Sequence, residues 1–129
     1  MSTVPNGAES ARPFLPSKDF ALSRRFYEAL GFKKLLDGDV AIFAAGPSSF
    51  ILTNFYDEAH VNNYMMQLMV DDLDAWWAHI VALNLPREFG VAAPKPPAMQ
   101  PWGLRIAYVA DPCGVLWHIA ERRPGNAAD

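Results

Sequence analysis

The chain has 129 residues, of which 51% are hydrophobic and 19% are charged, a composition that suits one folded domain over 1–129 and excludes a disordered chain. Its formal net charge of -3 excludes the basic surface that nucleic-acid-binding proteins present to phosphates, so we expect no nucleic-acid partner. The longest apolar runs have the length of a strand, which excludes a membrane-spanning helix. No basic cluster is long enough for a membrane-surface patch, so we expect no membrane partner.

The chain ends and the cysteine content bear on the cellular location. The first residues lack the cationic start and apolar run of a secretory signal. The one cysteine, Cys113, excludes an internal disulfide and is compatible with a reducing cytosol. We therefore expect a cytoplasmic protein, with a polar, flexible tail at 122–129.

The first half of the chain predicts a strand, a helix and further strands. A short strand at 12–16 leads into an amphipathic helix within 16–32, where apolar residues recur at helical spacing. Asp19 stands near the start of this helix, where its charge suits the helix dipole, and Gly31 is typical of a helix end. The apolar segment 40–55 then predicts strands.

The second half of the chain predicts the same order of elements. A strand at 64–70 leads into a helix within 70–85, which begins near Asp72 and ends at Asn84. The segment 105–120 again predicts strands, with a hairpin turn that contains Asp111. Two sequential units of the same kind therefore follow each other along the chain.

The two units align at fixed offsets. An offset of 53 places Asp19 on Asp72, and an offset of 65 places Thr53 on His118; we assign the difference of 12 to the Pro-rich insert at 89–100. One helix per four strands disfavours a doubly wound parallel sheet. The sequence predicts an α+β fold of two strand–helix–three-strand repeats, at about 12–56 and 63–121, whose sheets curl around a cleft.

Two stretches together resemble a known family. They are "LPSKDFALSRRFYEALGF" at 15–32 and "DPCGVLWHIAE" at 111–121, and they resemble the glyoxalase/bleomycin resistance/dioxygenase superfamily, also called vicinal oxygen chelate proteins. With "PWG" at 101–103, the chain looks most similar to the bleomycin-binding resistance proteins. The resemblance implies paired βαβββ modules that form a U-shaped mixed sheet around a cleft, and a homodimer.

The same resemblance implies four symmetric positions where metalloenzymes of the superfamily carry their ligands. Here these positions hold Arg12, Met65, Thr53 and His118. Arginine has no lone pair to donate and methionine is a soft ligand, so only His118 is a good donor for a divalent ion. We therefore expect no metal and no cofactor.

Strand alternation and family position together predict the residues that face the cleft. Aromatic rings would stack on a ligand, methionines would adapt to its shape, and a few polar groups would orient it. Such residues on strands more often belong to a core, and this reading stays open at each position. The predicted ligand-binding residues are Arg12, Phe43, Phe55, Met65, Gln67, Trp102, Tyr108 and His118.

Two functions remain open from the sequence. The first is metal-independent binding of a small aromatic or amphipathic molecule, with sequestration of a bleomycin-type antibiotic as one case. The net charge of -3 provides only modest attraction for that cationic drug. The alternative is a lyase, isomerase or dioxygenase-type enzyme that uses His118 and Tyr108 as an acid/base pair. No third residue clearly orients the histidine, which favours binding.

Overall fold

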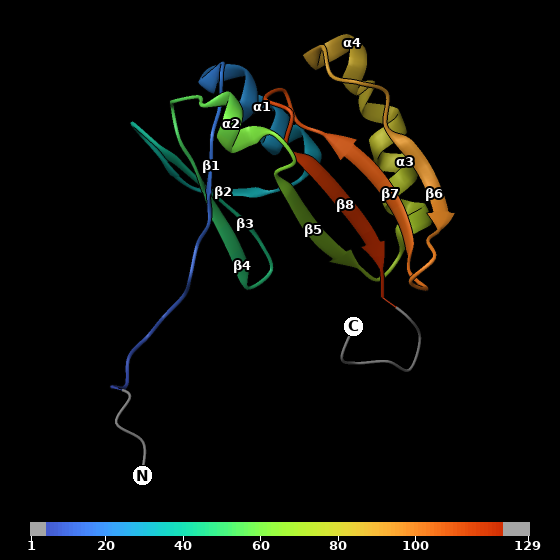
Figure 1. The fold of residues 1–129 in the computed structure, drawn as a ribbon, viewed down its shortest axis with the longest axis horizontal. Coiled ribbons are helices and arrows are strands. Elements are labelled where there is room, and N and C mark those ends of the chain that lie inside the picture. Colours follow the sequence, from blue (N-terminus) through green and yellow to red (C-terminus); the bar gives the residue numbers. More distant parts are fainter. Residues whose placement is uncertain (1–4, 123–129) are drawn as a thin grey trace.

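The protein folds into two units of the same kind (Figure 1). The computed structural model describes residues 5–122, so the tail expected to be flexible lies, apart from Arg122, outside the described residues. In chain order the elements are β1 (Phe14–Leu15), α1 (Phe20–Leu30), β2 (Lys33–Asp37), β3 (Ala41–Ala45), β4 (Ser48–Leu52), α2 (Glu58–Val61), β5 (Met65–Val70), α3 (Leu73–Leu83), α4 (Leu85–Phe89), β6 (Lys95–Met99), β7 (Arg105–Ala110) and β8 (Leu116–Glu121).

The strands form two four-stranded sheets. Sheet A has the strand order β1-β4-β3-β2, and sheet B has the equivalent order β5-β8-β7-β6. In each sheet the first strand of the repeat pairs parallel with the last, and the other pairs are antiparallel. This arrangement confirms the predicted α+β fold with two βαβββ repeats, with the sheet divided into two. In Figure 1, α3 lies behind sheet B and leaves the opposite face of that sheet open.

The two long helices begin and end where the sequence predicts. Asp19 and Asp72 are the N-cap residues, and their side chains accept hydrogen bonds from backbone amides at 3.1 and 3.0 Å. Gly31 ends α1 with φ of 121°, and Asn84 ends α3 in the left-handed region. None of the helices within 5–122 has the length and apolar character that crossing a membrane requires.

The strand register corrects the alignment of the two repeats. Phe14 and Gln67 are equivalent at the offset of 53. Ile51 pairs with Phe14 and His118 pairs with Gln67, so Ile51, rather than Thr53, is the equivalent of His118. In the same way Ile42, which pairs with Ile51, is the equivalent of Tyr108. The offset is therefore 66 at β3 and β7 and 67 at β4 and β8.

The predicted position of Phe43 on the cleft face is wrong. Phe43 is fully buried and its ring lies 5.7 Å from that of Tyr27 in the core. A register error of one residue moves a side chain to the opposite face of a sheet. The predicted offset of 65 places Phe43 on Tyr108 and contains that error, because the hairpin that follows β7 is one residue longer than the hairpin that follows β3.

The Pro-rich insert forms part of sheet B. Its residues 95–99 are β6, the edge strand, which pairs with β7 through a bulge between Lys95 and Ala98. Pro96 and Pro97 lie in this bulge, where they do not break a regular ladder. The short helices α2 and α4 were not predicted.

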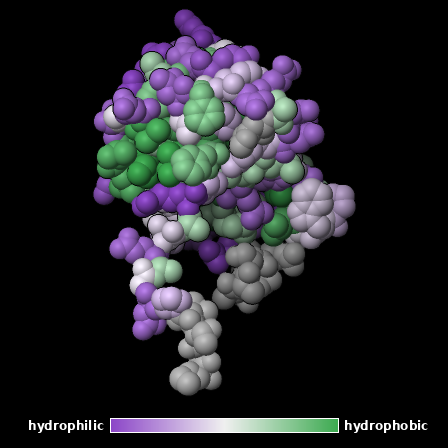
Figure 2. All heavy atoms as spheres, turned by 60° about the vertical axis from the view of Figure 1, so that its left-hand side comes forward, coloured by the Kyte–Doolittle hydropathy of each residue, from purple (hydrophilic) through white to green (hydrophobic). Residues whose placement is uncertain are grey.

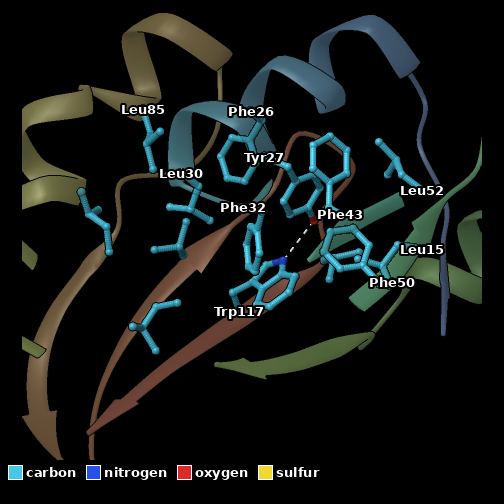
Figure 3. Close-up of a cluster of buried hydrophobic side chains, with 14 of the residues drawn as sticks. Leu15, Phe26, Tyr27, Leu30, Phe32, Phe43, Phe50, Leu52, Leu85 and Trp117 are labelled. Carbon is cyan, nitrogen blue, oxygen red and sulfur yellow. Dashed lines mark hydrogen bonds between the residues drawn. The ribbon is translucent and has the colours of Figure 1, made fainter. Parts of the chain in front are cut away.

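An aromatic core joins the two repeats. Tyr27, on α1 of the first repeat, donates a hydrogen bond of 2.5 Å to the carboxylate of Asp111 in the β7–β8 turn. Its hydroxyl also accepts a 3.0 Å hydrogen bond from Nε1 of Trp117 on β8 (Figure 3). Burial raises the pKa of Asp111, while the hydrogen bonds from Tyr27 and three backbone amides act in the opposite direction.

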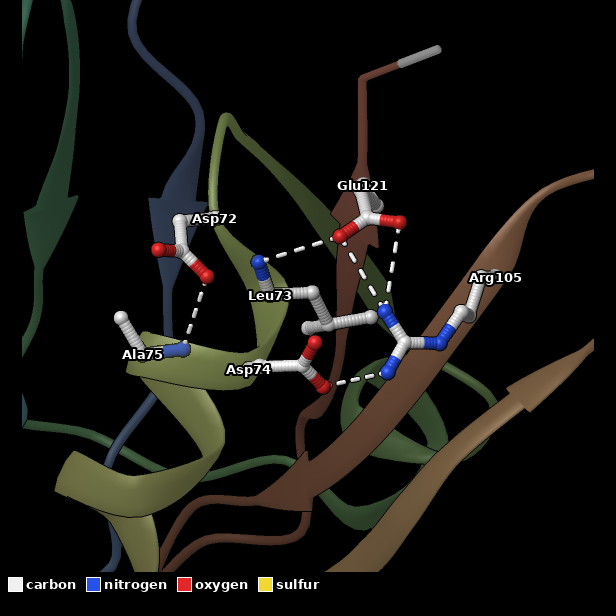
Figure 4. Close-up of polar contacts among 6 residues, drawn as sticks. All are labelled: Asp72, Leu73, Asp74, Ala75, Arg105 and Glu121. Carbon is white, nitrogen blue, oxygen red and sulfur yellow. Dashed lines mark hydrogen bonds and ion pairs between the residues drawn. The ribbon is translucent and has the colours of Figure 1, made fainter.

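An ion-pair cluster attaches α3 to sheet B on the helix-covered side. Both carboxylate oxygens of Glu121 accept hydrogen bonds from Nη1 of Arg105, at 3.2 and 3.1 Å, and Nη2 pairs with Asp74 (Figure 4). One Glu121 oxygen also accepts a 3.4 Å bond from the backbone amide of Leu73, the first residue of α3. The positive charge of Arg105 is therefore paired with the carboxylates of Asp74 and Glu121.

The hydroxyl of Tyr27 should contribute measurably to stability. Tyr27→Phe leaves Asp111 without one donor and Trp117 without its acceptor, both inside the core. We expect the free energy of unfolding in urea to fall by about 1–3 kcal/mol. Tyr56→Phe is the matched control, because Tyr56 lies at the surface, and it should leave the stability unchanged. Equal stabilities of both variants would contradict this role.

Candidate functional site

A row of polar side chains crosses the open face of sheet B. Gln67 on β5 pairs with His118 on β8, His118 with Tyr108 on β7, and Tyr108 with Lys95 on β6. Residues on either side of His118 in β8, such as Trp117, point into the core instead. Because successive side chains in a strand point to opposite faces, all four members of the row lie on the side away from the core.

The equivalent row of sheet A is apolar. Phe14 pairs with Ile51, Ile51 with Ile42, and Ile42 with Leu36. Phe14 and Leu36 are 57% and 49% exposed, so this row lies at the surface of the described chain. Figure 2, in which the side of the molecule with sheet A comes forward, shows a patch of hydrophobic side chains on that side. The two repeats thus present faces of different chemistry.

His118 lies at the centre of the polar row. Its ring stands edge-on to that of Tyr108, with the ring centroids 4.7 Å apart. Its Nε2 lies 3.4 Å from the sulfur of Met65 on the neighbouring strand. Partial burial lowers the pKa of His118 below its ordinary value, because desolvation disfavours the charged imidazolium. The structure therefore brings together Met65, Gln67, Tyr108 and His118 of the predicted set.

A cleft of about 450 Å³ opens beside Tyr108. This volume falls within the range of small-molecule sites. Of its lining, only Tyr108 belongs to the predicted set; Lys95 and Gln100 were missed, because the Pro-rich insert that contains them was not interpreted as a strand. The lining residues are Ala92, Ala93, Lys95, Gln100, Tyr108, Ala110 and Leu116.

The remaining predicted residues lie outside this cleft. Arg12, just before β1, donates a 2.6 Å hydrogen bond from Nε to the hydroxyl of Ser49 on sheet A. Phe55 follows β4 and is 65% exposed, and Trp102 lies in the β6–β7 turn and is 56% exposed. A ligand-binding role for these three residues stays a prediction.

A second cavity, of about 470 Å³, lies between the two sheets. Its walls include Phe50 of sheet A and Met66 and Trp117 of sheet B, which are core-face residues, and it reaches Gln67. The polar side chains of Ser48, Ser49, Gln67 and Arg122 also line this cavity. The cleft beside Tyr108 is the better candidate, because Tyr108 pairs with His118, whose ring it contacts, at the centre of the polar row.

The donor set does not fit a metal ion. With the corrected register, the position equivalent to His118 holds Ile51, while Thr53 is buried and its hydroxyl donates to the carbonyl of Leu15 at 3.1 Å. Beside His118 the nearest donor is the thioether of Met65, a poor ligand for hard divalent ions. Among the side chains that the structure describes, at 5–59 and 61–122, no three of His, Cys, Asp or Glu are grouped so that they could hold a metal.

Comparison with known proteins gives both a family and a set of similar structures. The sequence model of the Glyoxalase/Bleomycin resistance protein/Dioxygenase superfamily matches residues 10–119. No significant match was found among curated protein sequences. A solved bleomycin-binding protein, complexed with bleomycin, is 25% identical, with a TM-score of 0.71 over 90% of this chain and 100% of that one.

Two further solved structures share the fold. Lactoylglutathione lyase from Agrobacterium tumefaciens is 20% identical, with a TM-score of 0.64 over 89% of this chain and 95% of that chain. The fosfomycin resistance protein FosX from Mesorhizobium loti is 14% identical, with a TM-score of 0.67 over 94% of this chain and 96% of that chain. At these identities the likeness concerns the fold alone.

The lowered pKa of His118 predicts a pH dependence of stability. The folded state binds a proton at His118 less readily than the unfolded chain, whose ordinary histidine pKa is 6.5. Stability from this group is therefore complete above that pH and is lost as the pH falls through 6.5 towards the lowered value. His118→Gln should lose less stability than the parent protein over this range, as measured by urea unfolding at stepped pH. Parallel curves for the two proteins would contradict the shift.

Proposed function

Because the chain belongs to the Glyoxalase/Bleomycin resistance protein/Dioxygenase superfamily, we propose that it binds a small aromatic or amphipathic molecule without a metal ion. The binding site is the cleft beside Tyr108 and His118 on the open face of sheet B. The observation that carries the proposal is a cleft of about 450 Å³ with an apolar lining and the polar groups of Lys95, Gln100 and Tyr108 at its wall.

A bleomycin-type antibiotic is one candidate ligand. The similar structure that contains bleomycin supports this choice, because its chain aligns over its whole length with this protein. Stacking on an aromatic ring contributes about 0.5–1.5 kcal/mol beyond the buried area, and Tyr108 offers such a ring at the cleft wall. The net charge of -3 provides only modest long-range attraction for a cationic drug.

The alternative is an enzyme that uses His118 and Tyr108. The edge-on contact of the two rings and the lowered histidine pKa favour a neutral imidazole that can accept a proton at neutral pH. The group beside Nε2 of His118 is the thioether of Met65, however, and not a carboxylate that would orient the ring. Binding without turnover is therefore the preferred function.

Thermal unfolding in the presence of bleomycin and of smaller aromatic molecules tests the binding site. A ligand that binds the folded state raises Tm, and at a hundredfold excess over Kd it stabilises by about 2.7 kcal/mol. Tyr108→Ala should weaken binding about tenfold or more, because the ring in the cleft wall is lost. Tyr56→Ala, which removes an exposed ring outside the cleft and outside the predicted set, should leave binding unchanged.

Two results would contradict this function. A Tm that no compound in the panel changes would argue against the cleft as a binding site. Chemical conversion of a bound compound, abolished by His118→Gln while binding persists, would favour the enzyme instead. Product analysis after incubation detects this second outcome.

We further propose that the protein is a homodimer in which the apolar row of sheet A is covered. Two members of this row, Phe14 and Leu36, are 57% and 49% exposed. A contiguous apolar patch of this kind marks an interaction surface. Leu36→Glu should shift the sedimentation coefficient from that of a dimer to that of a monomer, whereas Met99→Glu, an exposed change on β6, should not. A monomeric parent protein would contradict the proposal.

A further inference from the structure

The residues that line the cleft carry positive charge and no negative charge. Of the seven residues that line it, Lys95 is the only charged one, and none is a carboxylate. Lys95 stands directly opposite Tyr108 in the β6–β7 register, and both residues line the cleft. Both side chains can donate hydrogen bonds.

Lys95 differs from two other cations on these strands, Arg105 and Lys34. Arg105 lies on the helix-covered side of sheet B and is paired with Asp74 and Glu121. Lys34 of sheet A is paired with Glu28, at 2.5 Å, and with a second carboxylate. Within residues 5–122, Lys95 forms no ion pair, so its charge remains available to a ligand.

The rest of the polar row adds no carboxylate that could pair with a cation. Gln67 and His118 continue the row from Tyr108 towards β5 and carry no negative charge. The other cleft walls are apolar: Ala92, Ala93, Ala110 and Leu116. A ligand that fits this arrangement has a flat apolar body and an oxyanion at one end, because a cation would meet Lys95 without a compensating carboxylate.

We propose that the ligand of this cleft is a small aromatic carboxylate, with its carboxylate at Lys95 and the Tyr108 hydroxyl and its ring against the alanine and leucine side chains. This inference rests on the proposed function, since it names the ligand class of the same site. It disfavours a cationic molecule as the natural ligand. The charge pair is the stronger contact, because a charged donor and acceptor form a shorter and stronger hydrogen bond than neutral groups do.

Three isosteric probes test the preference for an oxyanion. They are 2-naphthoate, 2-naphthamide and 2-naphthylmethylamine, which share one ring system and differ in the charge of the attached group. Titration calorimetry at neutral pH should give a Kd for naphthoate about tenfold or more below the values for the amide and the amine. Lys95→Gln should remove this difference, and Lys95→Arg should keep it.

Lys33→Gln provides the matched control. Lys33 is an exposed lysine on β2 of sheet A, so this variant has the same net charge as Lys95→Gln without a change in the cleft. The preference for naphthoate should survive in Lys33→Gln. Its equal loss in both variants would overturn the inference, because the net charge and not the cleft would then set the preference.

The remaining outcomes separate this inference from the proposed function. If the amide or the amine binds as tightly as naphthoate and Tyr108→Ala weakens that binding, the cleft binds aromatic molecules but the oxyanion inference is overturned. If none of the three probes binds with a Kd below about 1 mM, both the inference and the proposed cleft are overturned.

Discussion

The buried hydrogen bonds among Tyr27, Asp111 and Trp117 are the constraint on which the two-repeat structure depends. They join α1 of the first repeat to the last hairpin of the second, over 84 and 90 residues of chain. The carboxylate of Asp111 also accepts bonds from the backbone amides of Cys113, Gly114 and Val115. A buried carboxylate is tolerated only when its oxygens are satisfied, and here four donors satisfy them.

This core network also positions the candidate site. Trp117 and His118 are successive residues of β8, so the ring that is held in the core by Tyr27 directs its neighbour to the open face of sheet B. The parallel pairing with β5 then places Gln67 and Met65 beside His118. The site is thus built on paired strands, whose geometry is more constrained than that of a loop.

The sequence predicted the parts of the fold that local chemistry determines. Asp19 and Asp72 cap the helices and an offset of 53 relates them, because capping and helical periodicity are local properties. The side of sheet A to which Phe43 points was not predictable in the same way, since it depends on the length of a hairpin turn. Lys95 was missed because the two prolines that follow it are unfavourable in a regular strand. Only the pairing with β7 identifies residues 95–99 as a strand.

The prolines of β6 also affect the outer edge of sheet B. An edge strand with regular backbone amides can pair with a strand of another molecule, which is a common route to fibrils. Pro96 and Pro97 have no amide hydrogen to donate, and the bulge that contains them bends the ladder. The strand that carries Lys95 is therefore also a poor template for amyloid growth.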